Sequence, residues 1–289
     1  VPSESVMTQD QKTLYYQMRR VVPSINYTKS LDDARNKKWN FLLRTFFLRE
    51  EGETNNPTKI NDSTYYFYKQ TNNSTIAELQ TTFSNNRALY PYNANLKIDG
   101  DKDFLRIAFT GNGFLNYDAS GKGLNVRVFA GKFFYLNSAA HYGTRNFDLI
   151  PYQFSLTSTA AQDFTYSDYF IGRSETSGWM SQQIVQNDGF FKISTPPSYQ
   201  SIGISDNWIA ALNFTADIPD NINPFSKLPF KMPVRAFLDA GTYSEAWTDN
   251  ISAPSGKYLY DAGLQVSLLH DALTVYFPLL YSKVFRDAY

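Results

Sequence analysis

Cysteine is absent from this 289-residue sequence. Disulfide bonds, thiolate metal sites and cysteine nucleophiles are therefore excluded, and the absence suits a chain that crosses an oxidising periplasm. No apolar run reaches the roughly 18 residues of a transmembrane helix; the longest apolar-rich stretch, Leu273–Tyr281, is interrupted by Thr274 and Pro278. A charge excess is also missing, because 27 basic residues balance 27 acidic ones. Nothing in the composition favours nucleic acid as a partner.

Aromatic residues are abundant instead. They make up 17% of the chain, with 23 Phe, 21 Tyr and 4 Trp. Membrane β-barrels hold such residues in two girdles, one at each water–lipid interface. The composition therefore favours a membrane β-barrel over an ordinary soluble domain.

The dominant pattern is an alternation of apolar and polar residues, which places successive side chains on opposite faces of a strand. In the segment Tyr258–Leu269, Tyr260, Leu264 and Val266 share one face, and Asp261 and Gln265 share the other. The same alternation recurs in five further segments: Trp39–Arg49, Phe104–Gly111, Leu124–Leu136, Asn207–Ala216 and Leu273–Tyr281.

The pattern predicts an all-β fold, a transmembrane antiparallel β-barrel of about 12 strands that forms a single domain over residues 1–289. Long extracellular loops are expected at the four polar segments Glu51–Asp62, Gln162–Ser177, Pro196–Ser205 and Pro219–Pro233. A soluble β-sandwich or jelly roll also alternates. Its strands are usually shorter, however, and its polar face points to water.

Several segments resemble the C-terminal barrel of Bacteroidetes outer-membrane proteins whose N-terminal part resembles a gluzincin (aminopeptidase N-like) metallopeptidase. The resemblance is carried by Arg87–Tyr92 (RALYPY), Val126–Phe134 (VRVFAGKFF), Asp168–Gly178 (DYFIGRSETSG), Val234–Tyr243 (VRAFLDAGTY) and Tyr260–Lys283 (YDAGLQVSLLHDALTVYFPLLYSK). It implies a location in the bacterial outer membrane and a barrel that anchors a partner protein or an extracellular domain.

The resemblance does not imply peptidase activity. That activity requires H-E-x-x-H, in which two histidines ligate zinc and the glutamate activates water. The sequence has only His141 and His270, and neither begins such a motif. We therefore expect no catalytic zinc, no other metal, no cofactor and no enzyme activity. A serine-hydrolase triad remains open in principle, although no G-x-S-x-G elbow occurs.

Six charged residues lie on the polar faces of predicted strands and are expected to point into the lumen. They are Arg44, Arg106, Arg127, Arg235, Asp239 and Asp261. Unpaired charge in a confined interior is costly, so these residues should pair; Asp261 is a candidate partner for Arg235. One interpretation is an ion-pair network in a closed barrel, and the other is a charged constriction that selects solutes.

An aromatic cluster falls within a predicted loop. Phe164, Tyr166 and Tyr169 are expected to form a docking surface for a partner, because an exposed apolar patch outside the membrane marks an interaction site. The expected partners are membrane lipid or lipopolysaccharide and other outer-membrane or surface proteins. Three functional classes follow: an anchoring barrel, a channel or transporter with a charged lumen, and a membrane-embedded lipid hydrolase.

Overall fold

The computed structural model describes residues 5–7, 16–53, 58–61, 64–67, 69–117, 121–136, 153–157, 165, 183–193, 202–219, 221–223, 232–248, 256–268 and 273–287. Most of these residues lie in β-strands. Two short helical elements accompany the strands: the 3-10 helix η5 (Ser244–Trp247) and helix α1 (Lys283–Asp287). Neither is long or apolar enough to span a membrane, and no other helix occurs in the described ranges.

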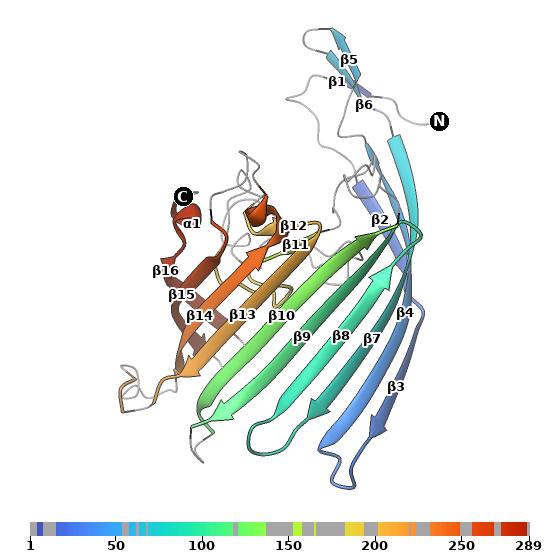
Figure 1. Ribbon diagram of the computed structural model, residues 1–289. Helices are drawn as coiled ribbons and strands as arrows, with labels where there is room; N and C mark the ends of the chain where they lie inside the picture. Colours follow the sequence, from blue (N-terminus) through green and yellow to red (C-terminus); the bar gives the residue numbers. More distant parts are fainter. Residues whose placement is uncertain are drawn as a thin grey trace.

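One antiparallel sheet of eleven strands dominates the molecule (Figure 1). Its strands are β2 (Tyr16–Val21), β3 (Ser24–Ser30), β4 (Lys37–Glu53), β7 (Lys69–Asn85), β8 (Tyr92–Gly100), β9 (Phe104–Asn116), β10 (Gly123–Tyr135), β13 (Trp208–Asp217), β14 (Val234–Tyr243), β15 (Leu259–Leu268) and β16 (Leu273–Tyr281). Neighbours in this order pair with one another, except that β2 and β3 both pair with β4. The predicted all-β antiparallel fold is confirmed, with a strand count close to the expected twelve.

Strands β2 and β3 lie end to end along one edge of β4. The first pairs with the upper part of β4, and the second pairs with the lower part, down to Lys38. Val22 and Pro23 separate the two strands. Proline cannot donate to a ladder, although the carbonyl O of Pro23 still accepts a hydrogen bond from the N–H of Thr45. Strands β2 and β3 therefore together take the place of a single strand in the wall.

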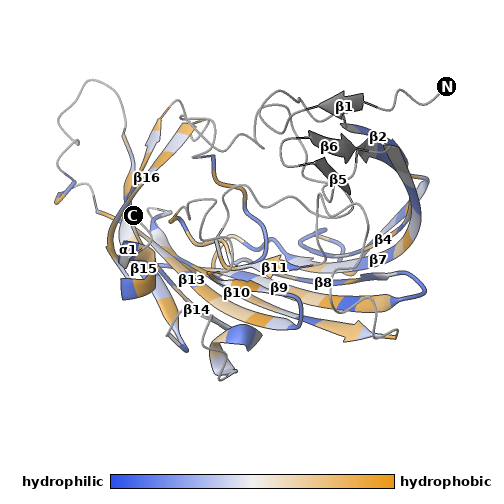
Figure 2. Cartoon of the chain, turned by 90° about the horizontal axis from the view of Figure 1, so that it is seen from above, coloured by the Kyte–Doolittle hydropathy of each residue, from blue (hydrophilic) through white to orange (hydrophobic). Residues whose placement is uncertain are grey.

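The sheet curves round an inner space, as the view from above shows (Figure 2). Its two edges are β16 on one side and β2 with β3 on the other. Within the described strands, no ladder joins these edges. Antiparallel sheets twist, and in this sheet the curvature gives the wall a barrel-like form.

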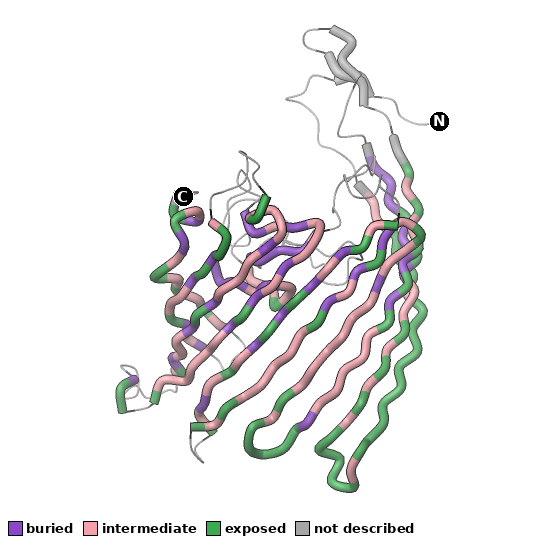
Figure 3. The backbone as a smooth tube through the Cα atoms, in the orientation of Figure 1, coloured by how far each residue is buried: buried purple, intermediate pink, exposed green. Residues whose placement is uncertain are grey.

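The two faces of the wall differ in character, in agreement with the predicted alternation. Large apolar side chains on the outer face remain exposed, including Phe41, Leu43, Leu79, Leu105, Phe109, Val128, Leu212, Leu238, Leu264, Val275 and Phe277. Buried positions alternate with them along the strands (Figure 3). A sandwich would cover the apolar face with a second sheet, and none of the described strands does so. The described strands therefore do not form the sandwich that was the alternative.

The connections lie at two ends of the wall, and we call the end drawn uppermost in Figure 1 the upper end. The β4–β7, β10–β13 and β14–β15 connections leave from this end. The predicted loop Pro219–Pro233 joins β13 to β14 at the opposite end, so it does not share a side with the other predicted loops. The alternation of residues within strands could not reveal this, because the end of the wall at which a loop lies depends on how many strands precede it.

Two other predicted loops contain regular structure. Glu51 lies within β4, which pairs with β7 over all 17 residues of each strand. Beyond it, β5 (Thr58–Asn61) and β6 (Thr64–Phe67) pair with each other, and β1 (Ser5–Met7) adds to β6. The segment Pro196–Ser205 ends in β12 (Ile204–Ser205), and its residues 196–201 lie outside the described part. Of Gln162–Ser177, only Thr165 is described.

Candidate functional site on the inner face

Part of the long β10–β13 connection returns to the inner face of the sheet. We call its described residues 153–157, 183–193 and 202–207 the inner segment. Strand β11 (Phe154–Ser155) pairs with β12, and the N–H of Phe191 donates to the carbonyl O of Leu156 at 2.9 Å. These backbone bonds give the inner segment a defined shape of its own.

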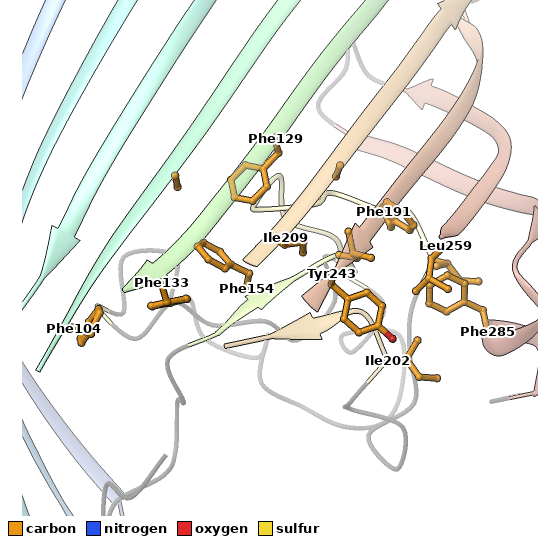
Figure 4. Close-up of a cluster of buried hydrophobic side chains, with 14 of the residues drawn as sticks. Phe104, Phe129, Phe133, Phe154, Phe191, Ile202, Ile209, Tyr243, Leu259 and Phe285 are labelled. Atoms are coloured by element: carbon orange, nitrogen blue, oxygen red, sulfur yellow. The ribbon is translucent and has the colours of Figure 1, made fainter. Parts of the chain in front are cut away.

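The inner segment packs against the upper half of the wall through apolar side chains (Figure 4). Its residues Phe154, Leu156 and Phe191 are fully buried. The Phe154 ring lies 4.6 Å from the Phe133 ring and 5.9 Å from the Phe129 ring, centroid to centroid. The same cluster includes Ile209, Tyr243, Leu259 and Phe285. The upper part of the inner space is therefore filled by a packed apolar core, whose burial stabilises the docked segment.

Two glycines of the wall make room for this packing. A Cβ atom on Gly131 would lie 2.5 Å from Cζ of Phe154, and one on Gly241 would lie 2.6 Å from Cδ2 of Leu156. Both glycines face the inner segment from the strands β10 and β14. The absence of a side chain at these two positions thus leaves room for Phe154 and Leu156 to pack directly against the wall.

We predict that Gly131→Ala lowers the free energy of unfolding by about 1–3 kcal/mol, the usual range for overpacking. The Phe154 ring cannot move aside, because it is buried between Phe129 and Phe133. Denaturant titration of the purified protein in detergent measures the effect. Gly113→Ala is the matched control, since nothing lies within 4 Å of its Cβ position. Equal free energies of unfolding for the two variants would contradict the close packing of Phe154 against Gly131.

The lower boundary of the docked segment is a charge cluster. Nζ of Lys192 lies 2.7 Å from Oδ1 of Asp239, and the backbone N–H of Lys192 donates to Oδ2 of Asp261 at 3.0 Å. Asp239 and Asp261 are directly opposite on β14 and β15. The exposed fractions of the three residues are 3%, 0% and 0%. Lys192 of the inner segment thus contacts both acidic side chains of the wall, Asp239 through its ammonium group and Asp261 through its backbone N–H.

Arg127 and Asn213 extend this cluster across β10 and β13. Nη1 of Arg127 donates to Oδ1 of Asn213, and Nδ2 of Asn213 donates to Oδ1 of Asp239, each at 2.9 Å. The same amide nitrogen donates to the carbonyl O of Gly189 at 2.9 Å. The Arg127 guanidinium also lies over the ring of Phe190, 5.7 Å from its centroid. The wall therefore holds the inner segment by backbone, amide and ionic contacts together.

A second charge cluster crosses the other half of the wall. Arg44 pairs with Glu78 at 2.6 Å, and Lys97 pairs with the same carboxylate at 3.1 Å. Lys97 also lies 3.7 Å from Asp99, which Arg106 contacts at 2.8 Å. These residues form a continuous row over β4, β7, β8 and β9 with both signs of charge.

The six predicted lumen charges all lie on the inner side, but their pairing differs from the expectation. Nε of Arg235 donates to Oδ1 of Asp217 at 2.8 Å, and the residue opposite Arg235 on β15 is Gln265. The predicted Arg235–Asp261 pair is therefore wrong, because the register places Asp261 four residue pairs higher, opposite Asp239. Arg44 and Arg106 meet Glu78 and Asp99, which were not among the predicted residues.

Lys192 was missed because it lies in no alternating segment of the sequence. The sequence pattern gave no signal for it, because Arg235 on a neighbouring predicted strand was already a candidate partner for Asp261. Outside the spanning strands, Glu245 of η5 accepts a hydrogen bond from Oγ of Ser205 at 3.1 Å. Burial raises the pKa of Glu245 above its ordinary value. This contact attaches the upper end of the inner segment to the wall.

Several predicted functional residues lie outside the described part of the chain: Phe164, Tyr166, Tyr169, His141 and His270. Thr165 is described and fully buried, and its carbonyl O accepts a hydrogen bond from Nη1 of Arg20 at 3.2 Å. Among the described residues, no group of three or more His, Cys, Asp or Glu side chains is placed to hold a metal ion. The contacts among the described residues hold the inner segment against the inner face of the sheet.

Comparison with known proteins adds little to this description. No family model and no curated protein matches the sequence. Among solved structures, the chain is similar to the crystal structure of BamA from Haemophilus ducreyi lacking POTRA domains 1-3, with 12% sequence identity and a TM-score of 0.42. The match covers 93% of this chain and 52% of that one, so the chain spans about half the length of the protein it matches.

Proposed function

We propose that this chain forms the wall of an outer-membrane β-barrel that anchors a partner protein or an extracellular domain at the bacterial surface. The observation that carries the proposal is the exposed apolar outer face, which lies opposite an inner face that carries the charge clusters and is filled in its upper part by the inner segment. Lipid is the environment in which such an outer face is stable, because burial of alternate side chains in hydrocarbon requires no second layer of protein.

Aromatic residues near the ends of the strands support the membrane location. Near the lower end, the Trp39 ring lies 6.4 Å from the Phe83 ring, which lies 5.9 Å from the Tyr92 ring. Near the upper end, the rings of Trp247 and Tyr258 are 5.6 Å apart. Two aromatic zones separated by an aliphatic band are typical of a wall that crosses a bilayer.

The filled interior favours anchoring over transport. The inner segment packs into the upper half of the inner space, where close packing at Gly131 and Gly241 and the buried Lys192–Asp239 ion pair hold it. With its interior filled in this way, the wall presents the connections at its upper end to a partner. The expected docking residues Phe164, Tyr166 and Tyr169 belong to the same β10–β13 connection that supplies the inner segment.

The anchoring role is tested by mass spectrometry of the protein purified from native outer membranes in mild detergent. We expect a stoichiometric partner, or a longer polypeptide that carries a peptidase-like domain. Conversion of Phe164, Tyr166 and Tyr169 to Ala should remove a separate partner, whereas Tyr258→Ala on the outer wall should leave it bound. A barrel that purifies alone would contradict anchoring.

A channel is the second candidate, and the lower half of the inner face favours it. Asn93, Asn95 and Asn112 line this half, and the side chains of Arg44 and Lys97 in the charge row are partly exposed. Single-channel recording in planar bilayers distinguishes the two candidates. Stable conductance that changes with Arg235→Ala would favour the channel, and a silent bilayer with inserted protein would favour the anchor.

A further inference from the structure

The upper end of β14 and β15 carries an exposed aromatic and cationic cluster. Trp247 and Tyr258 are 45% and 68% exposed, and their rings meet edge to face. Nζ of Lys257 lies over the Trp247 ring, 4.8 Å from its centroid. Three large side chains therefore gather at a surface position where apolar rings are costly in water.

Hydrogen bonds hold this cluster in a defined geometry. Nε1 of Trp247 donates to Oγ1 of Thr242 at 2.8 Å, and Oγ1 of Thr242 donates to the carbonyl O of Lys257 at 2.6 Å. Thr242 thus links the end of β14 to the residue that precedes Tyr258. The Trp247 ring and the backbone of Lys257 are both hydrogen-bonded to the Thr242 side chain, and these bonds define the geometry of the cluster.

The cluster lies on the outer face of the wall. Thr242 is opposite Ala210, whose neighbour Ile209 is buried on the inner side. Leu259 is buried inward, so Tyr258 and Tyr260 on either side of it point outward. The exposed Leu264 continues the row of Tyr260 downward. The cluster therefore marks the point where the apolar band meets water.

A second cation occupies the same level on β10, three strands away from β15. Lys132 on β10 is opposite Trp208 on β13, and its Nζ lies 5.8 Å from the centroid of the Phe134 ring. The same nitrogen donates to Oδ1 of Asn207 at 2.5 Å. We call Lys132, Phe134, Trp208, Trp247, Lys257 and Tyr258 the upper belt. With a spacing of about 4.8 Å between strands, its two lysines stand roughly 14 Å apart along the wall.

The charge of the upper belt and its position on the wall together identify the ligand that it binds. Aromatic rings at an interface lie at the level of lipid headgroups, and lysine ammonium groups beside them bind phosphate. Glu245 is the acidic residue of η5, and it is engaged by Ser205 of the inner segment. The belt therefore offers cations at headgroup level without a competing carboxylate from that helix.

We propose that the upper belt binds the phosphate groups of anionic lipid headgroups, one at Lys257 over Trp247 and one at Lys132. The proposal rests on the membrane location proposed above. It specifies which part of the wall recognises lipid, and it commits to lipid-borne phosphate as the ligand. The apolar rows beneath the belt hold the acyl chains of the same molecule.

The experiment compares retention of phosphatidylglycerol, measured by native mass spectrometry of the protein released from mixed phosphatidylcholine–phosphatidylglycerol vesicles. Lys132→Gln combined with Lys257→Gln should reduce the retained phosphatidylglycerol, with apparent affinity falling roughly fivefold for each lysine removed. Lys102→Gln is the matched control. This lysine is also exposed at the upper end, but it lies in the β8–β9 turn and pairs with Asp103.

The outcomes separate this proposal from the membrane proposal. Failure of the wild-type protein to enter pure phosphatidylcholine vesicles would overturn the membrane location itself. Normal insertion with equal phosphatidylglycerol retention in the double variant and the control would overturn the upper belt alone. Loss of retention on addition of inorganic phosphate, with Na₂SO₄ at equal ionic strength as a control, would show a general phosphate site and overturn the commitment to lipid.

Discussion

Replacement of Lys192 by Met is expected to lower the free energy of unfolding by about 3–5 kcal/mol, the usual cost of removing one partner from a buried ion pair. The substitution leaves Asp239 and Asp261 directly opposite each other without the ammonium group that pairs with Asp239. Neither carboxylate can reach water, because both side chains are fully buried. Release of the inner segment is the simplest way for the protein to relieve this cost.

Limited proteolysis and denaturant titration in detergent measure the two consequences. We expect faster cleavage within residues 183–193 and a lower unfolding midpoint than in the wild-type protein. Lys192→Met combined with Asp239→Asn and Asp261→Asn removes the cation and both anions, and it should recover most of the lost stability. If the single variant kept wild-type stability and protease resistance, the charge cluster would not hold the segment.

Replacement of Leu238 by Arg is expected to cost about 2–4 kcal/mol of membrane stability, the range for arginine on the lipid face at the middle of a barrel wall. Leu238 is exposed on the outer face of β14, beside the inward-facing Asp239. Its side chain is central in the strand, so a long cation there has to cross several residues of apolar wall before it reaches water.

Refolding into phosphatidylcholine vesicles, followed by denaturant titration, checks this expectation. Leu136→Arg is the control at the upper rim, where the side chain is exposed just beyond the end of β10 and the cost should fall to about 0–1 kcal/mol. Equal effects at the two depths would mean that the outer face does not contact lipid. A soluble and monomeric wild-type protein would lead to the same conclusion.

Much of the wall could be predicted because strand alternation is a local property. Arg127 and Asn213 point inward and Val128 and Leu212 point outward, as the sequence pattern indicates, since successive side chains in a strand take opposite faces. The exposed aromatic and aliphatic rows follow from the same rule. The strand count was also close, because turn signals mark where each pass ends.

The partners of the inner-face charges could not be predicted from the pattern, because pairing depends on the register between strands. A shift of two residues keeps every side chain on its face and changes every partner. For this reason Arg235 meets Asp217 and not Asp261. The row from Arg44 to Arg106 likewise depends on how β4, β7, β8 and β9 are aligned.

The sequence by itself determined the class of fold and the two faces of the wall, because alternation and composition act within single strands. Only the tertiary structure decided what fills the wall. The inner segment has no periodicity that points inward, and its seat at Gly131 and Gly241 forms only when distant parts of the chain meet. Lys192 acquires its role in the same way, because two carboxylates on neighbouring strands become a binding site for a cation only after the sheet has formed.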